Sequence, residues 1–342
     1  MFKRILFVLA FAFSSFALMA QNESFETFSV LNLSSFAPTT ALGMDFTPFK
    51  AQDITLAITN PSLLDSSLNN QASISYTNIF NGIWQGNIAY SHSFNKWGSF
   101  SLGLNYISYG EFDRYEENGD KTGTFTANDF YFVIGWGRML DSNLYIGANF
   151  KPLFSHYDTY SSSALAFDVA LTYLSTNRLF AATLMARNFG AQINTYAYTK
   201  EDLPWQLELS VAKKLKHAPL TFYVQASNLQ TWDIRETDAL NPRDKTDAFT
   251  GQVTKENKAT AFLDKTFRHL NFGVDFQVMQ SLNLSVGYSW RRHKEMEIDN
   301  TFSLAGLSYG FGLNIKRFRL SYARNEYHKY GAPNYITLLV KI

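Results

Sequence analysis

The feature that most constrains this chain is a strict alternation of apolar with small or polar residues. In one run, Phe100, Leu102 and Leu104 alternate with Ser101 and Gly103. The same pattern recurs, with the apolar residues at every second position, in the stretches 165–173, 205–211, 270–278, 282–290 and 307–315. A period of two is typical of a β-strand whose two faces meet different environments. Runs of about nine to eleven residues match tilted strands that cross a bilayer.

The charges in these runs indicate which face meets lipid. The aromatic and branched positions carry no charge, whereas Asp168, Glu208 and Asp275 all fall on the other face. A Lys or Arg on a lipid face costs roughly 2–4 kcal/mol near the bilayer midplane, and an Asp or Glu less. We therefore expect the apolar face to meet lipid and the polar face to line a lumen. There, the three carboxylates are expected to hydrogen-bond an inner segment or water rather than to form a substrate or ion path.

The connections between the runs support the same architecture. Fourteen runs begin near residues 72, 84, 98, 125, 143, 162, 178, 205, 219, 267, 281, 304, 317 and 334. Every second connection is tight and those between are mostly long, as in outer-membrane barrels, whose long loops lie outside the cell. A soluble sandwich would carry more charge, since only 17% of the residues are charged against about 25% in soluble domains. The predicted fold class is all-β, a transmembrane antiparallel β-barrel of about 14 strands over residues 71–342.

The first twenty residues predict export. Lys3 and Arg4 precede an apolar stretch at 5–13, and Ala20 is a small residue before a cleavage site at Gln21. An uncleaved helical anchor is the alternative, but the apolar stretch is shorter than the roughly 18 residues that a span needs. Because the chain has no cysteine, disulfides and a lipid anchor are excluded. We predict a removed signal peptide at 1–20 and an integral protein of the Gram-negative outer membrane.

Residues 21–70 differ from the rest, because they lack sustained alternation and form a predicted plug or hatch inside the barrel. An Ala-Leu-Gly stretch at 41–43 is followed by Asn60, Pro61, Ser62, Leu63 and Leu64. This arrangement resembles the start of FadL-like barrels, and is most similar to the branch that holds the PorV and PorQ proteins of the type IX secretion system of Bacteroidota. The stretch 28–33 is more similar to PorQ-like members, although 37–39 lacks the basic residue of their usual Ser-Ala-Arg.

The resemblance implies a non-catalytic scaffold that anchors a surface partner of the attachment complex. The implied partner is PorZ-like, with PorU-like and PorV-like proteins in the same assembly, and outer-membrane lipid and lipopolysaccharide surround the barrel. The alternative implied by the wider family is a transporter of hydrophobic small molecules, which predicts a lateral gap in the wall and an apolar pocket under the plug. The Ser, Asn and Gly of the lumen face favour the scaffold, and the plug argues against a third alternative, a general porin.

The longest connection, from about Leu229 to Thr266, is the predicted partner-docking loop, because a loop this long without structure of its own is usually functional. It carries Trp232, Arg235, Arg243 and Lys245. A second basic stretch, 291–294, either contacts lipopolysaccharide phosphates or is a solvated loop. For Asn60 and Pro61 two interpretations stay open: Pro61 ends an extended segment while Asn60 ties the turn to the barrel wall, or both contact a hydrophobic ligand.

Motifs of enzymes are missing from the sequence. The six histidines do not form a metal-ligand spacing such as HExxH, and there is no P-loop. Neither GxSxG nor GxGxxG occurs in the strand-to-helix context that its chemistry needs. A net charge of +1 gives no basic cluster for nucleic acid. We therefore expect no catalytic residues, no metal and no cofactor. The Gly-rich stretches 135–137 and 310–312 are expected to make room for the plug.

Overall fold

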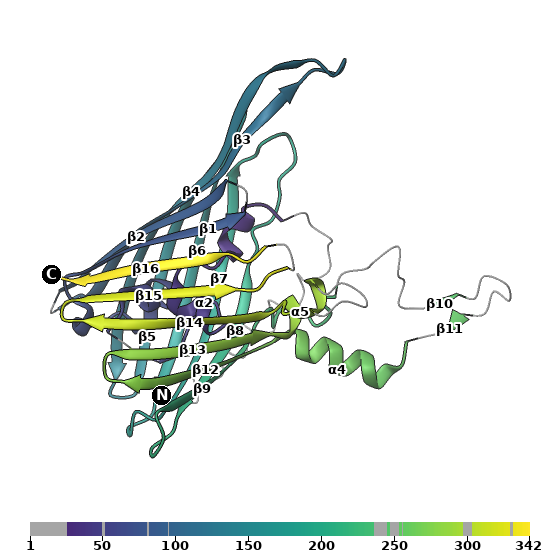
Figure 1. The fold of residues 1–342 in the computed structure, drawn as a ribbon. Coiled ribbons are helices and arrows are strands. Elements are labelled where there is room, and N and C mark those ends of the chain that lie inside the picture. The colour runs from purple at the N-terminus through teal and green to yellow at the C-terminus, as the bar shows by residue number, and fades with distance from the viewer. Residues whose placement is uncertain are drawn as a thin grey trace, which may run out of the picture.

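A computed structural model describes residues 26–49, 52–80, 82–94, 96–235, 256–296, 303–328 and 331–342, and the backbone of 245–246 and 253–254. It is a closed antiparallel barrel of fourteen strands, each paired with its two neighbours (Figure 1). This confirms the predicted fold class. The predicted signal peptide at 1–20 lies outside the described residues.

The barrel strands begin close to the predicted positions, the first at Gln71 and the last at Asn334. They are β1 Gln71–Phe80, β2 Ile83–Phe94, β3 Gly98–Tyr115, β4 Lys121–Asp141, β5 Leu144–Tyr157, β6 Tyr160–Leu174, β7 Phe180–Asn194, β8 Gln206–Lys214, β9 Leu220–Ala226, β12 Leu270–Met279, β13 Leu282–Ser289, β14 Leu307–Ile315, β15 Phe318–Asn325 and β16 Asn334–Lys341. β1 pairs with β16 and closes the barrel. Because strand side chains alternate, every second residue faces outward, as with the exposed Leu284 and Val286 of β13.

The two ends of the barrel differ. Short turns lie at the end that holds the C-terminus, whereas β3 and β4 rise far beyond the other rim (Figure 1). The long β9–β12 connection also leaves from this outer rim. It was predicted to lack structure, which is wrong: it holds a small hairpin of β10 Lys245–Thr246 and β11 Val253–Thr254, then α4 Lys258–Arg268. The stretch 291–294 is likewise helical rather than a loop, within α5 Trp290–Met296.

No helix among the described residues has both the length and the apolar character needed to span a membrane.

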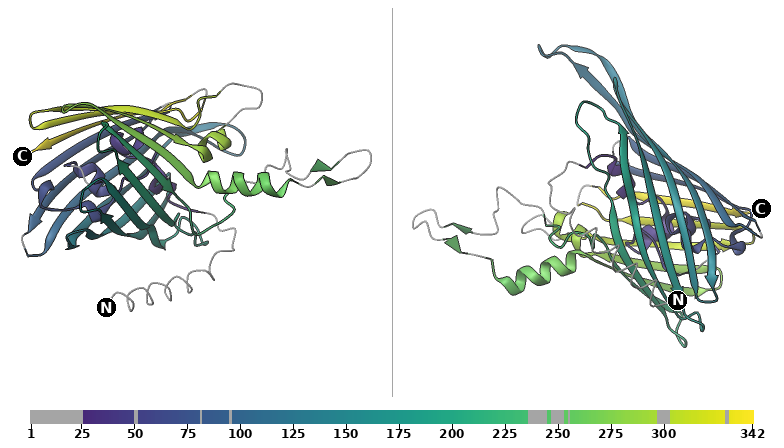
Figure 2. Two further views of the ribbon diagram at one scale, coloured as in Figure 1. Left: turned by 90° about the horizontal axis from the view of Figure 1, so that it is seen from below. Right: turned by 180° about the vertical axis from the view of Figure 1, so that it is seen from behind.

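The plug, described over residues 26–49 and 52–70, lies inside the barrel as a series of short helical turns (Figures 1 and 2). They are η1 Ser29–Asn32, α2 Ala37–Ala41, α3 Ile54–Thr59, η2 Pro61–Leu63 and η3 Ser66–Leu68. Pro61 therefore does not end an extended segment, as the sequence suggested, but begins η2 directly after α3. Segments this short do not hold a helix in isolation, so the surrounding wall stabilises them.

Glycines in the wall give the plug its room. A Cβ on Gly147 would lie 2.2 Å from the carbonyl carbon of Pro61, and one on Gly137 2.4 Å from the oxygen of the same residue. A Cβ on Gly310 would lie 2.8 Å from the Cβ of Ala41, and 2.2 Å from the oxygen of Tyr322 in the neighbouring strand. The space predicted at 135–137 and at Gly310 is therefore filled by the plug. Gly312 differs, because its nearest neighbours are Asn283 and Arg319 of the wall.

Candidate functional site

The lumen-facing polar residues of the wall are hydrogen-bond partners of the plug. Thr337 accepts a hydrogen bond from the backbone N–H of Ala37 at 3.1 Å, and Gln225 accepts one from that of Asp45 at 3.1 Å. In the other direction, the amide of Asn149 donates to the carbonyl oxygen of Ile58 at 3.1 Å. Buried backbone groups need such partners. The Ser-, Thr- and Asn-rich lumen face is therefore the complement of a buried, irregular segment.

Asn60 is completely buried and joins two turns of the plug to the wall. Its Nδ2 donates to the carbonyl oxygen of Thr47 at 3.0 Å and to Thr183 Oγ1 at 3.3 Å. Its Oδ1 accepts from Ser62, whose hydroxyl lies 2.6 Å from that of Thr172. The neighbouring Leu63 and Leu64 are buried in the apolar core of the plug. These contacts describe a structural tie at 60–64.

A buried cluster of charges connects the plug to β5, β6, β7 and β8. Arg187 Nη1 lies 3.3 Å from Glu208 Oε2 on the next strand and 3.6 Å from Asp45 Oδ2 of the plug. Lys151 Nζ lies 2.7 Å from Asp168 Oδ2. Asp168 and Glu208 therefore face the lumen as predicted, and they pair with cations of the wall. The expectation that they hydrogen-bond the plug or water stays a prediction. Within this cluster, Arg187 also pairs with the plug, through Asp45.

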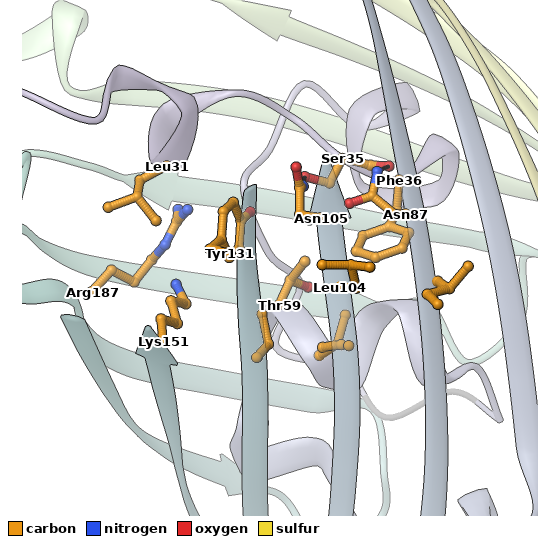
Figure 3. A pocket seen from close by; sticks show the side chains of 14 residues that line it. Leu31, Ser35, Phe36, Thr59, Asn87, Leu104, Asn105, Tyr131, Lys151 and Arg187 are labelled. Carbon is orange, nitrogen blue, oxygen red and sulfur yellow. Dashed lines mark hydrogen bonds between the residues drawn. The ribbon is translucent and has the colours of Figure 1, made fainter. Parts of the chain in front are cut away.

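The sequence interpretation missed both cations. Arg187 and Lys151 occupy lumen-facing positions of their strands and follow the same alternation that placed the carboxylates. The signal was thus present, although only the acidic residues were singled out. Figure 3 shows the two cations side by side at one end of a cavity of about 50 Å³, with Tyr131 beside them and Asn87 and Asn105 farther along.

Part of the lumen face is apolar, although the sequence indicated a face rich in Ser, Asn and Gly rather than in Leu or Phe. Ile107, Tyr131, Val133 and Leu153 point inward from β3, β4 and β5 and are buried. They form one core with plug residues that include Leu31, Phe36, Ile54, Ile58 and Leu64. The inner surface of the barrel is therefore apolar in this region. The polar lumen face had been the argument against a transporter of hydrophobic molecules, and that argument does not apply here.

Above this core, an aromatic cavity of about 380 Å³ opens at the outer mouth. Phe28 of the plug, Tyr157 and Tyr160 of the wall and Tyr196 of the β7–β8 connection line it, with Asp129 among the lining residues. The rings of Tyr157 and Tyr196 lie 5.6 Å apart, and Phe28 stacks on Tyr196 at 6.5 Å. Burial raises the pKa of the Tyr196 phenol, so this side chain stays neutral. We call these four aromatic residues the outer aromatic cavity.

Asp129 gives this cavity a polar floor. It is buried, and Tyr109 donates a hydrogen bond of 2.7 Å to its Oδ2 while Ser155 donates to its Oδ1. The plug closes the cavity on one side, where Thr27 N–H donates to the oxygen of Asp202 at 3.0 Å. Glu26, Thr27, Ser29 and Glu201 complete the lining, so the four aromatic residues share the cavity with polar groups. Its volume falls within the roughly 300–1,000 Å³ that is typical of pockets for small ligands.

A second cavity of about 180 Å³ lies on the inner side of the plug. Leu42, Phe49 and Leu56 of the plug line it together with Tyr223 and Asp275 of the wall. Asp275 accepts hydrogen bonds from Asn283 at 2.8 Å and Ser285 at 2.6 Å, so it too pairs with the wall rather than with the plug. The transporter hypothesis predicted an apolar pocket under the plug, and this cavity has a mixed lining of apolar and polar residues. A lateral gap was also predicted, yet within the described residues each strand of the barrel is paired with both neighbours.

The predicted docking residues have different environments in the structure. Trp232 is 54% exposed and its ring lies 5.6 Å from that of Phe262 in α4. Arg235 is enclosed by carboxylates, with its side chain only 6% exposed, so its guanidinium is not available to a partner. Arg243 and the side chain of Lys245 lie outside what the structure describes. No group of three or more metal-ligating side chains occurs among the described residues.

No family model and no curated protein sequence matches the chain. Among solved structures, the toluene transporter TodX of Pseudomonas putida is similar, with a TM-score of 0.54 at 11% identity over 91% of this chain and 98% of that chain. The toluene transporter TbuX of Ralstonia pickettii has a TM-score of 0.50 at 10% identity, covering 90% of this chain and 98% of its own. The fold is that of a FadL-like outer-membrane barrel.

A FadL homologue of Pseudomonas aeruginosa is also similar, with a TM-score of 0.49 at 10% identity over 90% of this chain and 98% of that chain. The named neighbours are transporters and a FadL homologue, not enzymes. Identities this low establish the fold and nothing about cargo. None of them is a PorV-type or PorQ-type protein, so that finer assignment stays a prediction.

Proposed function

We propose that the protein takes up small hydrophobic molecules through the outer membrane. The observation that carries this proposal is the outer aromatic cavity, which adjoins the apolar core between plug and wall. A hydrophobic molecule leaves water more favourably for such a site than for a polar lumen. The proposed cargo is compatible with the fold, since two solved structures that share it are toluene transporters.

In this proposal the plug is the gate. It fills the lumen below the cavity and is held by exchangeable hydrogen bonds and by the Arg187–Asp45 pair. A cargo molecule in the outer aromatic cavity touches Phe28, which lies just before η1 of the plug. Displacing this first part of the plug opens a route along the apolar wall residues. Uptake by this route needs no covalent chemistry, so the proposed role is not that of an enzyme.

Uptake of radiolabelled toluene and oleate by cells that carry the chain, the empty vector or a variant tests the proposal. Tyr196→Ala removes one wall of the outer aromatic cavity, and Tyr198→Ala is the matched control, because Tyr198 is on the same connection and fully exposed. We expect uptake above the vector for the intact chain, a loss for Tyr196→Ala and no change for Tyr198→Ala. Equal uptake by vector and intact chain would contradict the proposal.

A second candidate is the scaffold role implied by the resemblance at 36–64. The observation that favours it is the β9–β12 connection, which carries the β10–β11 hairpin away from the rim (Figure 1). Deleting 238–254 removes the hairpin but keeps Glu256, which pairs with Arg235 at 3.0 Å, and Asn257, which caps α4. We expect a PorZ-like surface partner to co-purify with the intact chain and not with the deletion. Unchanged recovery of the partner, or no partner in either case, would count against this role.

A further inference from the structure

Helix α4 has two chemically different faces. Over its eleven residues, Phe262, Leu263 and Phe267 fall on one side, whereas Lys265 and Arg268 fall on the other. The three apolar side chains are 56%, 55% and 40% exposed, respectively. Asn257 is the N-cap of the helix, because its side chain accepts a hydrogen bond from the N–H of Ala259 at 2.9 Å. It is therefore a defined element with an uncovered apolar face.

The later part of the charged face of α4, around Asp264, Lys265 and Arg268, contacts the protein itself. Lys265 Nζ lies 2.8 Å from Asp233 Oδ2, and Arg268 Nε lies 3.0 Å from Asp264 Oδ2. Arg235 lies against the same face, 4.0 Å from Asp264. A helix at a water-exposed rim is expected to turn its charges outward and its apolar residues inward. This orientation is reversed, and such an arrangement suits a surrounding of lipid rather than water.

The apolar face also continues the lipid-facing surface of the barrel. α4 leads into β12 within two residues, and the ring of Phe267 lies 5.7 Å from that of Trp290, which follows the outward-facing Leu284 and Val286 of β13. Trp232 extends the aromatic surface at the other side, in contact with Phe262. Figures 1 and 2 show α4 projecting from the outer rim away from the barrel and not crossing the mouth.

We propose that α4 lies in the interface of the outer leaflet, as a membrane-bound extension of the barrel. Phe262, Leu263, Phe267 and Trp232 insert among the acyl chains of the surrounding lipid. Aromatic and leucine side chains on one face, with basic residues on the other, are typical of helices that lie in a membrane surface. Tryptophan belongs at the same depth. The exposed Lys258 begins the helix on its charged side, facing the headgroup phosphates.

This places the second half of the predicted docking loop in lipid and leaves only the hairpin before it free for a protein. A docking helix for a protein partner is the rival use of the same face. Insertion into lipid and docking of a protein predict different surroundings for the apolar residues when the purified protein is in a bilayer without other proteins. In the first case lipid surrounds them, and in the second case water does. The difference is independent of whether the barrel transports hydrophobic molecules.

Because the sequence has no cysteine, single-cysteine labelling of the full chain tests this directly. An environment-sensitive fluorophore is attached at Leu263→Cys on the apolar face, at Lys258→Cys on the charged face, and at Leu284→Cys on the lipid-facing wall. Each labelled protein is placed in nanodiscs of phosphatidylcholine, with or without bromine atoms on the acyl chains. The heat-dependent shift in gel mobility of each variant verifies that its barrel is folded.

We expect brominated acyl chains to quench the label at 263 to the same extent as at 284, and to leave the label at 258 unchanged. Aqueous iodide should quench in the opposite order. If the label at 263 is quenched by iodide and not by brominated lipid, the helix stands in water and the lipid proposal is wrong. If that label then becomes protected in native outer-membrane vesicles, the face serves a protein partner instead.

Discussion

Replacing Arg187 with Met should loosen the plug more than any other single change in the charge cluster. Arg187 is the only cation within ion-pair distance of Glu208 in the described residues, and Glu208 is completely buried. Removing one partner of a buried pair costs about 3–5 kcal/mol, because the remaining charge is left uncompensated. This free energy destabilises the state in which the plug is in place, because water reaches and solvates Glu208 once the plug has moved away. At 1.4 kcal/mol for each factor of ten, the equilibrium constant for plug opening should rise roughly 100- to 4,000-fold.

Hydrogen exchange followed by mass spectrometry in nanodiscs measures this opening from peptides that cover 37–64. Lys213→Met is the control, since it removes an exposed cation from the end of β8. The double variant Arg187→Met/Glu208→Gln should recover most of the protection, because the buried charge is gone. Protection of the plug that is unchanged in Arg187→Met, or that falls equally in Lys213→Met, would refute this reasoning.

Three further predictions test other contacts. Gly147→Val places a side chain where Pro61 lies, and overpacking of about 1–3 kcal/mol should displace η2. The variant should then show more ion conductance in planar bilayers than the intact chain, and an unchanged conductance would contradict the close fit. Asn60→Ala removes two hydrogen bonds to Thr47 and Thr183, which at about 1 kcal/mol each should raise hydrogen exchange of the plug by roughly tenfold or more; an unchanged rate would show that the tie is dispensable. Arg235 donates hydrogen bonds to Asp233 and so holds the pKa of that carboxyl below its usual range. The stabilisation that this contact gives the folded state is complete above the unfolded pKa of about 3.9. It is lost only as the pH falls through the lower pKa of the folded state. The mobility of a spin label at Leu263→Cys should therefore stay constant between about pH 7 and about pH 5 and rise in stronger acid, whereas a rise near neutral pH would show that the Arg235 cluster does not hold α4.

The alternation of the sequence was sufficient to predict the barrel, its strand number and the side on which Asp168 and Glu208 lie. The rule follows from strand geometry, in which successive side chains point to opposite faces. It failed locally beyond Arg187, where β7 contains an irregularity and Asn188 adopts a left-handed conformation with φ 56°. Arg187 faces the lumen, and the next residue, Asn188, is completely buried. A strict period of two does not predict two such residues in succession.

The plug could be located but not shaped from the sequence. α2 and α3 hold five and six residues, too few for a helical period to be visible. Their form depends on partners far away in the chain, such as Thr337 for Ala37 and Asn149 for Ile58. Tertiary contacts of this kind decide a conformation that no local pattern encodes.

The predicted docking loop shows the opposite situation, in which a visible signal was passed over. Asn257 followed by the spacing of Phe262, Leu263 and Phe267 is a helix start with one apolar face. Length alone led to the expectation of an unstructured loop. The partners of Arg235, by contrast, could not have been deduced, because Asp233, Glu256 and Asp264 come together only when α4 packs on the segment before the hairpin.

Single-channel recording of the purified protein in planar bilayers tests most directly that residues 26–70 fill the barrel. A plugged barrel predicts a membrane that remains electrically silent when the folded protein is inserted, with discrete conductance steps appearing only after the plug is deleted. Stable conductance steps of the intact chain at low voltage would show an open lumen, and both the gate and the proposed route for hydrophobic molecules would then be wrong.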